Sequence, residues 1–222
     1  MFAYCNNNPI LYTDSEGLRP IVGDSITHET ADERRDSCNY MKELSKYNSP
    51  SNTVLVISNS DKDWMVSSGT MGLDMASAAG ANSSHVAATD TENFGDIWNS
   101  AKSNYAIVHT HGSPNSLQGD GFNFNINDEA QLQRNSNIKL LMITACSVGG
   151  DNNGAINMGQ VLSQKISPNG YVICATTTVW GADKYFYPAG GSWVVYQNGV
   201  QITANLPNTI TMALAVQFFN SK

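Results

Sequence analysis

The chain has 222 residues, of which 41% are hydrophobic and 14% charged, and its formal net charge is -7. This composition indicates a globular protein with a substantial core and excludes a disordered chain. The acidic balance argues against nucleic acid as a partner, because phosphate backbones are held by clustered Lys and Arg. We find no apolar run long enough to cross a bilayer and no signal-peptide pattern at the start, so we expect no membrane association.

The first 17 residues differ in character from those that follow. They contain two tyrosines, the run Asn7-Asn8-Pro9-Ile10 and the turn-forming run Asp14-Ser15-Glu16-Gly17. This pattern resembles the segment that closes the core domain of rearrangement-hotspot (RHS) repeat proteins, with Ser15 in place of the usual proline. The resemblance implies that residues 1–17 end such a core and that residues 18–222 are a toxin domain at its tip. It also implies a secreted or delivered effector without its own signal peptide, acting in the target-cell cytoplasm. Its expected partners are the parent RHS shell and a cognate immunity protein.

Apolar runs along the toxin domain predict the strands of a sheet. They are residues 53–58, 85–89, 105–111, 139–146, 171–176, 193–197 and 200–203. Continuous apolar runs without polar alternation are typical of buried parallel strands. The last two runs are joined by Asn198-Gly199, which predicts a hairpin with a two-residue turn.

Helical spacing of apolar residues predicts helices between these strands. They are residues 25–44, 64–81, 94–101, 128–134 and 156–166, and a last helix that Pro207 opens. Gly69 and Gly72 predict an interruption of the second of these helices, and the Gly/Asn-rich residues 112–127 predict a loop.

In the last helix we expect four residues to face inward: Ile210, Ala213, Leu214 and Phe218. The alternation of strands and helices predicts an α/β fold. Its form is a three-layer α/β/α sandwich with a mostly parallel central sheet, completed by a C-terminal β-hairpin and helix.

Two of the predicted strands end at reactive side chains, His111 and Cys146. Open α/β sheets carry their chemistry at the carboxyl ends of the strands. If the two strands are neighbours, a thiol nucleophile lies beside an acid/base group in one crevice. Cys174 lies inside an apolar run and Cys38 on an apolar helix face, so we expect both in the core. Since the chain has no Cys-x-x-Cys pair, we expect neither a zinc site nor a disulfide framework.

The residues around the two strand ends carry a second resemblance. An apolar strand ending in His111-Gly112, a spacer and an apolar strand ending in Ala145-Cys146 resemble the signature of the caspase-like clan of cysteine peptidases. That clan includes gingipains, clostripain, separase and the CHAT domains, and the resemblance covers roughly residues 53–182. It implies a caspase-like fold and a cysteine endopeptidase that cleaves proteins or peptides with a His111–Cys146 dyad and no cofactor. It also implies that the backbone N–H groups of Gly112 and Cys146 stabilise the oxyanion.

The resemblance places the primary substrate pocket within residues 176–183. Its candidate lining residues are Thr178, Trp180 and Asp183. A pocket that uses Asp183 favours Arg or Lys in the substrate, whereas one shaped by Thr178 and Trp180 favours a neutral residue. Other acidic candidates are Asp120, Asp128 and Asp151.

Two alternatives to a peptidase remain open at this stage. One is a caspase-like domain that binds partners without cleaving them. The other is a metal hydrolase, because His109-Thr110-His111 followed by Ser116 and Asp120 resembles the metal ligands of amidohydrolases and JAMM-type metalloproteases. Gly112 replaces their usual proline, Ser116 and Asp120 are one residue too far apart, and Cys146 has no role in this hypothesis. In the peptidase hypothesis no metal is expected, and His109 is a core residue or supports the catalytic one.

Overall fold

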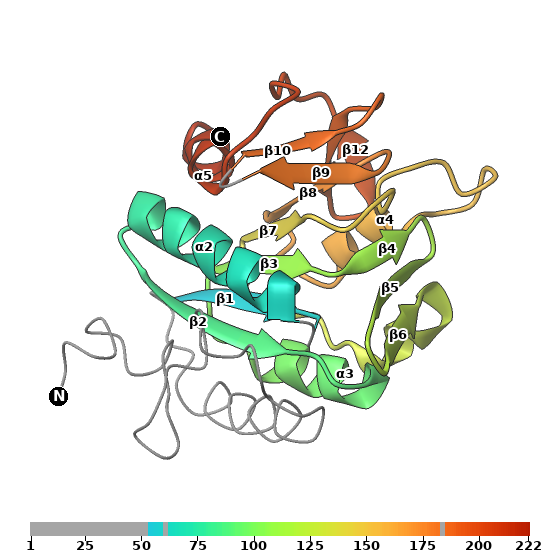
Figure 1. Cartoon of the computed structure of the whole chain (residues 1–222). Coiled ribbons are helices and arrows are strands. Elements are labelled where there is room, and N and C mark those ends of the chain that lie inside the picture. Colours follow the sequence, from blue (N-terminus) through green and yellow to red (C-terminus); the bar gives the residue numbers. More distant parts are fainter. Residues whose placement is uncertain (1–52, 60–61, 183–184) are drawn as a thin grey trace, which may run out of the picture.

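A seven-stranded mixed sheet forms the centre of the computed structural model, which describes residues 53–59, 62–182 and 185–222 (Figure 1). Its strands, in order across the sheet, are β12 (Val200–Ile202), β11 (Trp193–Gln197), β8 (Tyr171–Ala175), β7 (Leu140–Ile143), β3 (Tyr105–His109), β1 (Thr53–Ser58) and β2 (Asn82–Ala87). The five strands from β8 to β2 are parallel to one another, and β11 runs antiparallel to both of its neighbours, β8 and β12. The expected α/β fold is therefore confirmed, whereas residues 1–17 and the expected helix 25–44 lie outside the described residues.

Helices cover both faces of this sheet. Helices α3 (Thr91–Ser100) and α4 (Met158–Gln164) pack on one face, where Phe94, Trp98 and Leu162 join the buried strand residues. Helices α2 (Lys62–Ala79) and α5 (Met212–Asn220) pack on the other face through Met71, Met75 and Val216. The predicted stripe of α3 is confirmed, since its apolar face is fully buried. Within the described ranges, no helix combines the length and apolarity that a bilayer crossing requires.

Helix α2 is continuous, so the predicted interruption at Gly69 and Gly72 is wrong. A Cβ at Gly72 would lie 2.6 Å from Cγ2 of Val56 in β1 and would also meet the Ser83 hydroxyl in β2. Glycine is therefore required here because the helix backbone approaches the sheet too closely for a side chain. The packing gained on the sheet outweighs the lower helix propensity of glycine.

The expected loop over residues 112–127 is a three-stranded antiparallel arm. Its strands are β4 (His111–Ser113), β5 (Ser116–Gly119) and β6 (Phe122–Asn125), followed by the 3-10 helix η2 (Ile126–Gln131). The loop prediction was wrong because short two-residue turns separate strands whose alternate residues, Leu117, Phe122 and Phe124, are buried. Figure 1 shows this arm continuing from the end of β3.

Several predicted boundaries also shift. Strand β3 ends at His109 and β7 at Ile143, so His111 and Cys146 both lie beyond the sheet. A second hairpin, β9 (Val179–Ala182) and β10 (Tyr185–Pro188), was not predicted. Helix α5 begins at Met212 and not at Pro207, since the Thr211 side chain caps it by accepting from the Leu214 N–H.

The inward face of α5 also differs from the prediction. Its buried residues are Met212, Ala215 and Val216, while Leu214 is 37% exposed. Ile210 is buried, but it pairs with Phe186 of β10 ahead of the helix. The helix starts later than expected, so its inward stripe falls on a different set of residues. The hairpin at Asn198-Gly199 is confirmed, and both residues have the positive φ that this turn requires.

Candidate active site

Cys146 lies in a tight turn at the carboxyl end of β7. Ser147, which follows it, has a φ of +59°, a left-handed conformation that is uncommon outside glycine. Two backbone hydrogen bonds tie this turn to the end of β8, one from Ser147 N–H to Thr177 O (2.9 Å) and one from Gly149 N–H to Ala175 O (2.8 Å). The thiol is partly exposed, and its Sγ accepts a hydrogen bond from the Val179 N–H at 3.4 Å. A backbone donor aimed at sulfur stabilises the negative charge that a thiolate nucleophile carries.

A cavity of about 230 Å³ opens beside this thiol. Its walls come from helix α2, the ends of β3 and β7, and the β9–β10 hairpin. The residues that line it with Cys146 are Ser67, His109, Thr144, Val179, Gly181 and Phe186. The structure therefore brings a thiol, an imidazole and two hydroxyls to one hollow at the carboxyl end of the sheet, where α/β proteins bind their ligands.

His109 is the buried histidine of this cavity. Its Nδ1 is 2.7 Å from Thr144 Oγ1 and its Nε2 is 3.2 Å from Ser67 Oγ, so both ring nitrogens take part in hydrogen bonds. Burial, together with the nearby His85 and His111, lowers the pKa of His109 to about 3. The imidazole is therefore neutral near pH 7, and it forms the centre of a Ser67–His109–Thr144 hydrogen-bond chain.

His111 occupies a different environment two residues later. It is exposed, opens strand β4, and does not belong to the described residues that line the Cys146 cavity. Its neighbour Gly112 lies directly against the nucleophile turn, since a Cβ there would be 2.8 Å from Ala145 Cβ and 3.0 Å from Cys146 O. The backbone of the predicted His111-Gly112 pair thus meets that of Ala145-Cys146.

The expected oxyanion donors are the backbone N–H groups of Cys146 and Gly112. Within the described part of the chain, the Cys146 N–H donates to no carbonyl. Ser113 and Ser116 close a two-residue turn, and hydrogen-bonded pairs alternate with open ones along an antiparallel ladder. Gly112 opposite Leu117 is therefore an open pair, and its N–H points away from β5.

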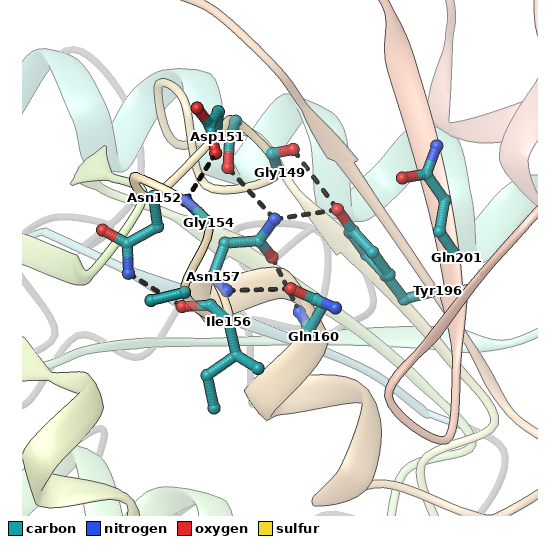
Figure 2. Close-up of a pocket in the computed structure, with 11 residues that line it drawn as sticks. Gly149, Asp151, Asn152, Gly154, Ile156, Asn157, Gln160, Tyr196 and Gln201 are labelled. Carbon is teal, nitrogen blue, oxygen red and sulfur yellow. Dashed lines mark hydrogen bonds between the residues drawn. The ribbon is translucent and has the colours of Figure 1, made fainter.

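A hydrogen-bond network holds the loop that follows the Cys146 turn (Figure 2). The buried Asn157 donates through Nδ2 to Gly150 O (3.1 Å) and to Tyr196 OH (2.8 Å), and Tyr196 OH donates to Gly149 O (3.3 Å). Asn157 also caps α4, because its side chain accepts from Gln160 N–H while the Gln160 side chain accepts from Asn157 N–H. The same residues line a second cavity of about 390 Å³.

The start of α4 also holds the β4–β5 turn. The N–H of Met158, the first residue of the helix, donates to Pro114 O at 2.7 Å. At its other end the arm is fixed by the Asn59 side chain, whose Oδ1 accepts from the Asp120 N–H at 2.9 Å. The arm that carries His111 and Gly112 is therefore anchored to two separate elements of the fold.

The two candidate pocket residues that the structure describes do not line the Cys146 cavity. Thr178 is exposed and Trp180 is 57% exposed, whereas Val179 and Gly181 line the cavity. Asp183 lies outside the described residues. Because side chains alternate across a strand, the predicted segment is present at the site, but Val179 and Gly181 line the cavity in place of Trp180.

The other acidic candidates serve local turns. Asp128 accepts from Asn125 N–H at the start of η2, and Asp151 accepts from Gly154 N–H. Asp120 is exposed next to its anchored backbone. Across the described ranges, no group of three or more His, Cys, Asp or Glu side chains is placed to hold a metal ion. Ser67 and Phe186 are site residues that no sequence motif marked.

Comparison with known proteins adds no relative: no protein-family model, curated protein or solved structure matches this chain.

Proposed function

We propose that this chain is a cysteine endopeptidase in which Cys146 attacks the peptide carbonyl. The observation that carries the proposal is the Cys146 turn itself. It presents a partly exposed thiol at the edge of a cavity, with a backbone N–H directed at its sulfur and its own N–H without a carbonyl acceptor among the described residues. These are the features that covalent attack on an amide requires.

His111 is the acid/base group of this proposal. A general base works best when its pKa is near the operating pH, and burial lowers the pKa of His109 to about 3. Both nitrogens of His109 are also already in hydrogen bonds, with Ser67 and Thr144. His111 is exposed, and its neighbour Gly112 packs against the Cys146 turn. His111 accordingly takes the proton of the thiol and returns it to the departing amine, while His109 supports the cavity.

The oxyanion of the tetrahedral intermediate is held by the N–H groups of Cys146 and Gly112. Preorganised backbone donors of this kind contribute roughly 3 kcal/mol each to a transition state. Glycine is needed at position 112, because a side chain would collide with Ala145 and Val148 at 2.8 and 2.9 Å. The close packing of Gly112 on the nucleophile turn supports both roles.

The RHS-like residues 1–17 give this peptidase its biological setting. They support a toxin domain carried at the tip of an RHS protein, with proteins of a target cell as substrates and an immunity protein as inhibitor. The mostly parallel sheet with helices on both faces and the order His111-Gly112, Ala145-Cys146 support membership of the caspase-like clan. An inhibitor of this enzyme would cover the Cys146 cavity.

The direct test is labelling by thiol-reactive peptide probes. The wild-type protein should be labelled at Cys146, as shown by peptide mass mapping, and should create new N-termini in a proteome-derived peptide library. Cys146→Ala should abolish both results and any toxicity on expression, and a chelator should change neither. Cys174→Ala is the matched control and should behave as wild type.

Two outcomes would overturn the proposal. Cleavage that survives Cys146→Ala but stops with a chelator favours metal chemistry at His109 and His111. A folded wild-type protein that neither cleaves peptides nor reacts with any probe favours a binding module without catalysis.

A further inference from the structure

The cavity beside Cys146 has apolar walls and one polar end. Val179 and Gly181 line it from the inward side of β9, and Phe186 lines it from β10. Phe186 is 4% exposed and is fixed by two backbone hydrogen bonds with Ile210, at 2.9 and 2.8 Å. A rigid apolar wall of this kind selects ligands by shape and by their lack of charge.

The polar end is the Ser67–His109–Thr144 chain. Its members satisfy one another through hydrogen bonds of 3.2 and 2.7 Å to the two ring nitrogens of His109. The Phe186 ring stands edge-on to the imidazole, with ring centroids 6.4 Å apart. Apart from the nucleophile Cys146, none of the described residues that line the cavity carries a charge near neutral pH, because burial keeps His109 deprotonated. The polar end therefore offers hydroxyl and imidazole groups but no counter-ion.

Gly181 keeps this cavity open. A Cβ at this position would lie 2.6 Å from Cε1 and 2.7 Å from Cδ1 of Phe186. Any larger residue at position 181 would have to displace the Phe186 ring, whose backbone is hydrogen-bonded to Ile210 and which stands edge-on to His109. The volume of about 230 Å³ is sufficient for one side chain of intermediate size.

We infer that this cavity is the primary specificity pocket, and that it accepts an uncharged side chain of intermediate size from the residue whose carbonyl Cys146 attacks. This assignment rests on the proposed peptidase function. A carboxylate, ammonium or guanidinium group entering the cavity would lose its hydration without meeting an opposite charge, which is costly. A Leu, Met or Gln side chain fills the cavity and packs against its apolar walls. The Gln amide can also form hydrogen bonds with the hydroxyl groups at the polar end. Substrate proteins are therefore cleaved after uncharged residues and not after Arg, Lys, Asp or Glu.

The test uses the whole chain and a set of fluorogenic peptides that differ only in the residue before the scissile bond. We expect kcat/KM after Leu, Met or Gln to exceed that after Arg, Lys, Asp or Glu by at least about 30-fold. A preference for Arg or Lys would overturn the assignment and show that an acid outside the described residues reaches the pocket. A preference for Asp or Glu would overturn it equally.

Two variants test the named walls. Ser67→Asp places a carboxylate at the polar end and should raise cleavage after Arg and Lys at least about 10-fold while lowering cleavage after Leu. Gly181→Ala narrows the cavity against Phe186 and should lower cleavage after Leu and Met about 10-fold relative to cleavage after Ala. Tyr185→Phe, on the exposed side of the same hairpin, is the control and should leave the profile unchanged. An unaltered profile in folded Ser67→Asp and Gly181→Ala would place the pocket elsewhere.

The failure of this assignment is distinguishable from the failure of the proposed function. A protein that cleaves peptides through Cys146 but with the wrong preference contradicts only the pocket. A protein that leaves every peptide intact and whose Cys146 no peptide probe labels contradicts both. If Ser67→Asp does not fold, the cleavage preference of the wild-type protein still tests the pocket assignment.

Discussion

Cys146 follows β7 and Cys174 lies within β8, two strands that pair in the sheet, yet the surroundings of the two thiols differ. Cys174 lies within β8 and is fully buried, and burial raises the pKa of its thiol. Cys146 lies three residues beyond the last residue of β7, partly exposed, with a backbone N–H directed at its sulfur. The two thiols therefore differ in exposure and in backbone contact because Cys146 lies past the end of its strand and Cys174 lies within one.

The same contrast separates His109 from His111. His109 is the last residue of β3 and is enclosed by Ser67, Thr144 and Phe186. His111 is exposed at the start of the arm. Two residues along the chain thus separate a buried imidazole from an exposed one.

The largest expected effect distinguishes the two cysteines. Cys146→Ala should lower kcat/KM by at least about 1,000-fold, because it removes the nucleophile and leaves only binding and the oxyanion donors. Cys174→Ala should keep the activity and lower the free energy of unfolding by about 1–2 kcal/mol, because it leaves a small void beside Gly149 and Gly159. Peptide cleavage assays and urea denaturation measure the two effects. Equal activity losses in both variants would contradict the proposal that Cys146 alone is the nucleophile.

The next effect distinguishes the two histidines. His111→Gln should lower kcat about 100-fold or more with little change in stability, because its side chain is exposed and acts on the proton. His109→Gln should lower the free energy of unfolding by about 1–3 kcal/mol, because it disrupts buried hydrogen bonds. Its kcat should fall less than that of His111→Gln. The reverse order of kcat would make His109 the acid/base group.

Alkylation rates compare the cysteines without any substitution. In the native protein, iodoacetamide should modify Cys146 at least about 100-fold faster than Cys174, which reacts only when the structure opens. In urea the two rates should converge. Mass mapping of the two peptides over time gives both rates in one sample, and similar native rates would contradict the burial difference.

Acid should destabilise the fold through its buried histidines. Burial lowers the pKa of His85 to about 4 and that of His109 to about 3, from an ordinary value of 6.5. Between pH 6.5 and those values the unfolded chain binds more protons than the folded one, so stability falls as pH falls. The loss at about pH 5 is roughly 2 kcal/mol for each histidine. Urea denaturation at about pH 7.5 and pH 5 should show a smaller loss for His85→Gln than for wild type, and equal losses would refute this origin.

The smallest effect concerns the loop behind Cys146. Tyr196→Phe removes the hydroxyl that accepts from Asn157 and donates to Gly149, and should cost about 1 kcal/mol of stability. Peptidase activity should fall only a few-fold, because the backbone bonds of Ser147 and Gly149 to the end of β8 remain. Thermal unfolding and cleavage rates measure both. No loss of stability would show that water replaces the hydroxyl.

Local sequence patterns predicted much of the central sheet, but they predicted neither the β4–β6 arm nor the continuity of helix α2. The apolar run at residues 53–58 and the Asn198-Gly199 turn each specify their structure over a few neighbouring residues, and both are confirmed. The arm of β4–β6 was missed because its strands have only three or four residues, and its glycines and asparagines resemble a loop. Helix α2 was predicted as broken because the close approach that requires Gly72 depends on tertiary packing.

The same limit applies to the candidate site. Cys146, Gly112 and the 176–183 segment were proposed from motifs, because each follows an apolar run that predicts a strand. Ser67 and Phe186 come from a helix and a hairpin far apart in the chain, and only the packed fold brings them to His109. The spacing of residues along the sequence does not predict such a long-range contact.

The start of α4 is bonded to both parts of the candidate site, the loop after Cys146 and the arm that carries His111. Asn157 binds the carbonyl of Gly150 in the loop after Cys146, and Met158 next to it binds the carbonyl of Pro114 in the arm that carries His111. A change in the position of this helix turn would therefore shift the loop and the arm together. Each part also has its own bonds, from Ser147 and Gly149 to the end of β8 and from Asp120 to Asn59, so the helix turn couples two parts that the sheet already holds separately.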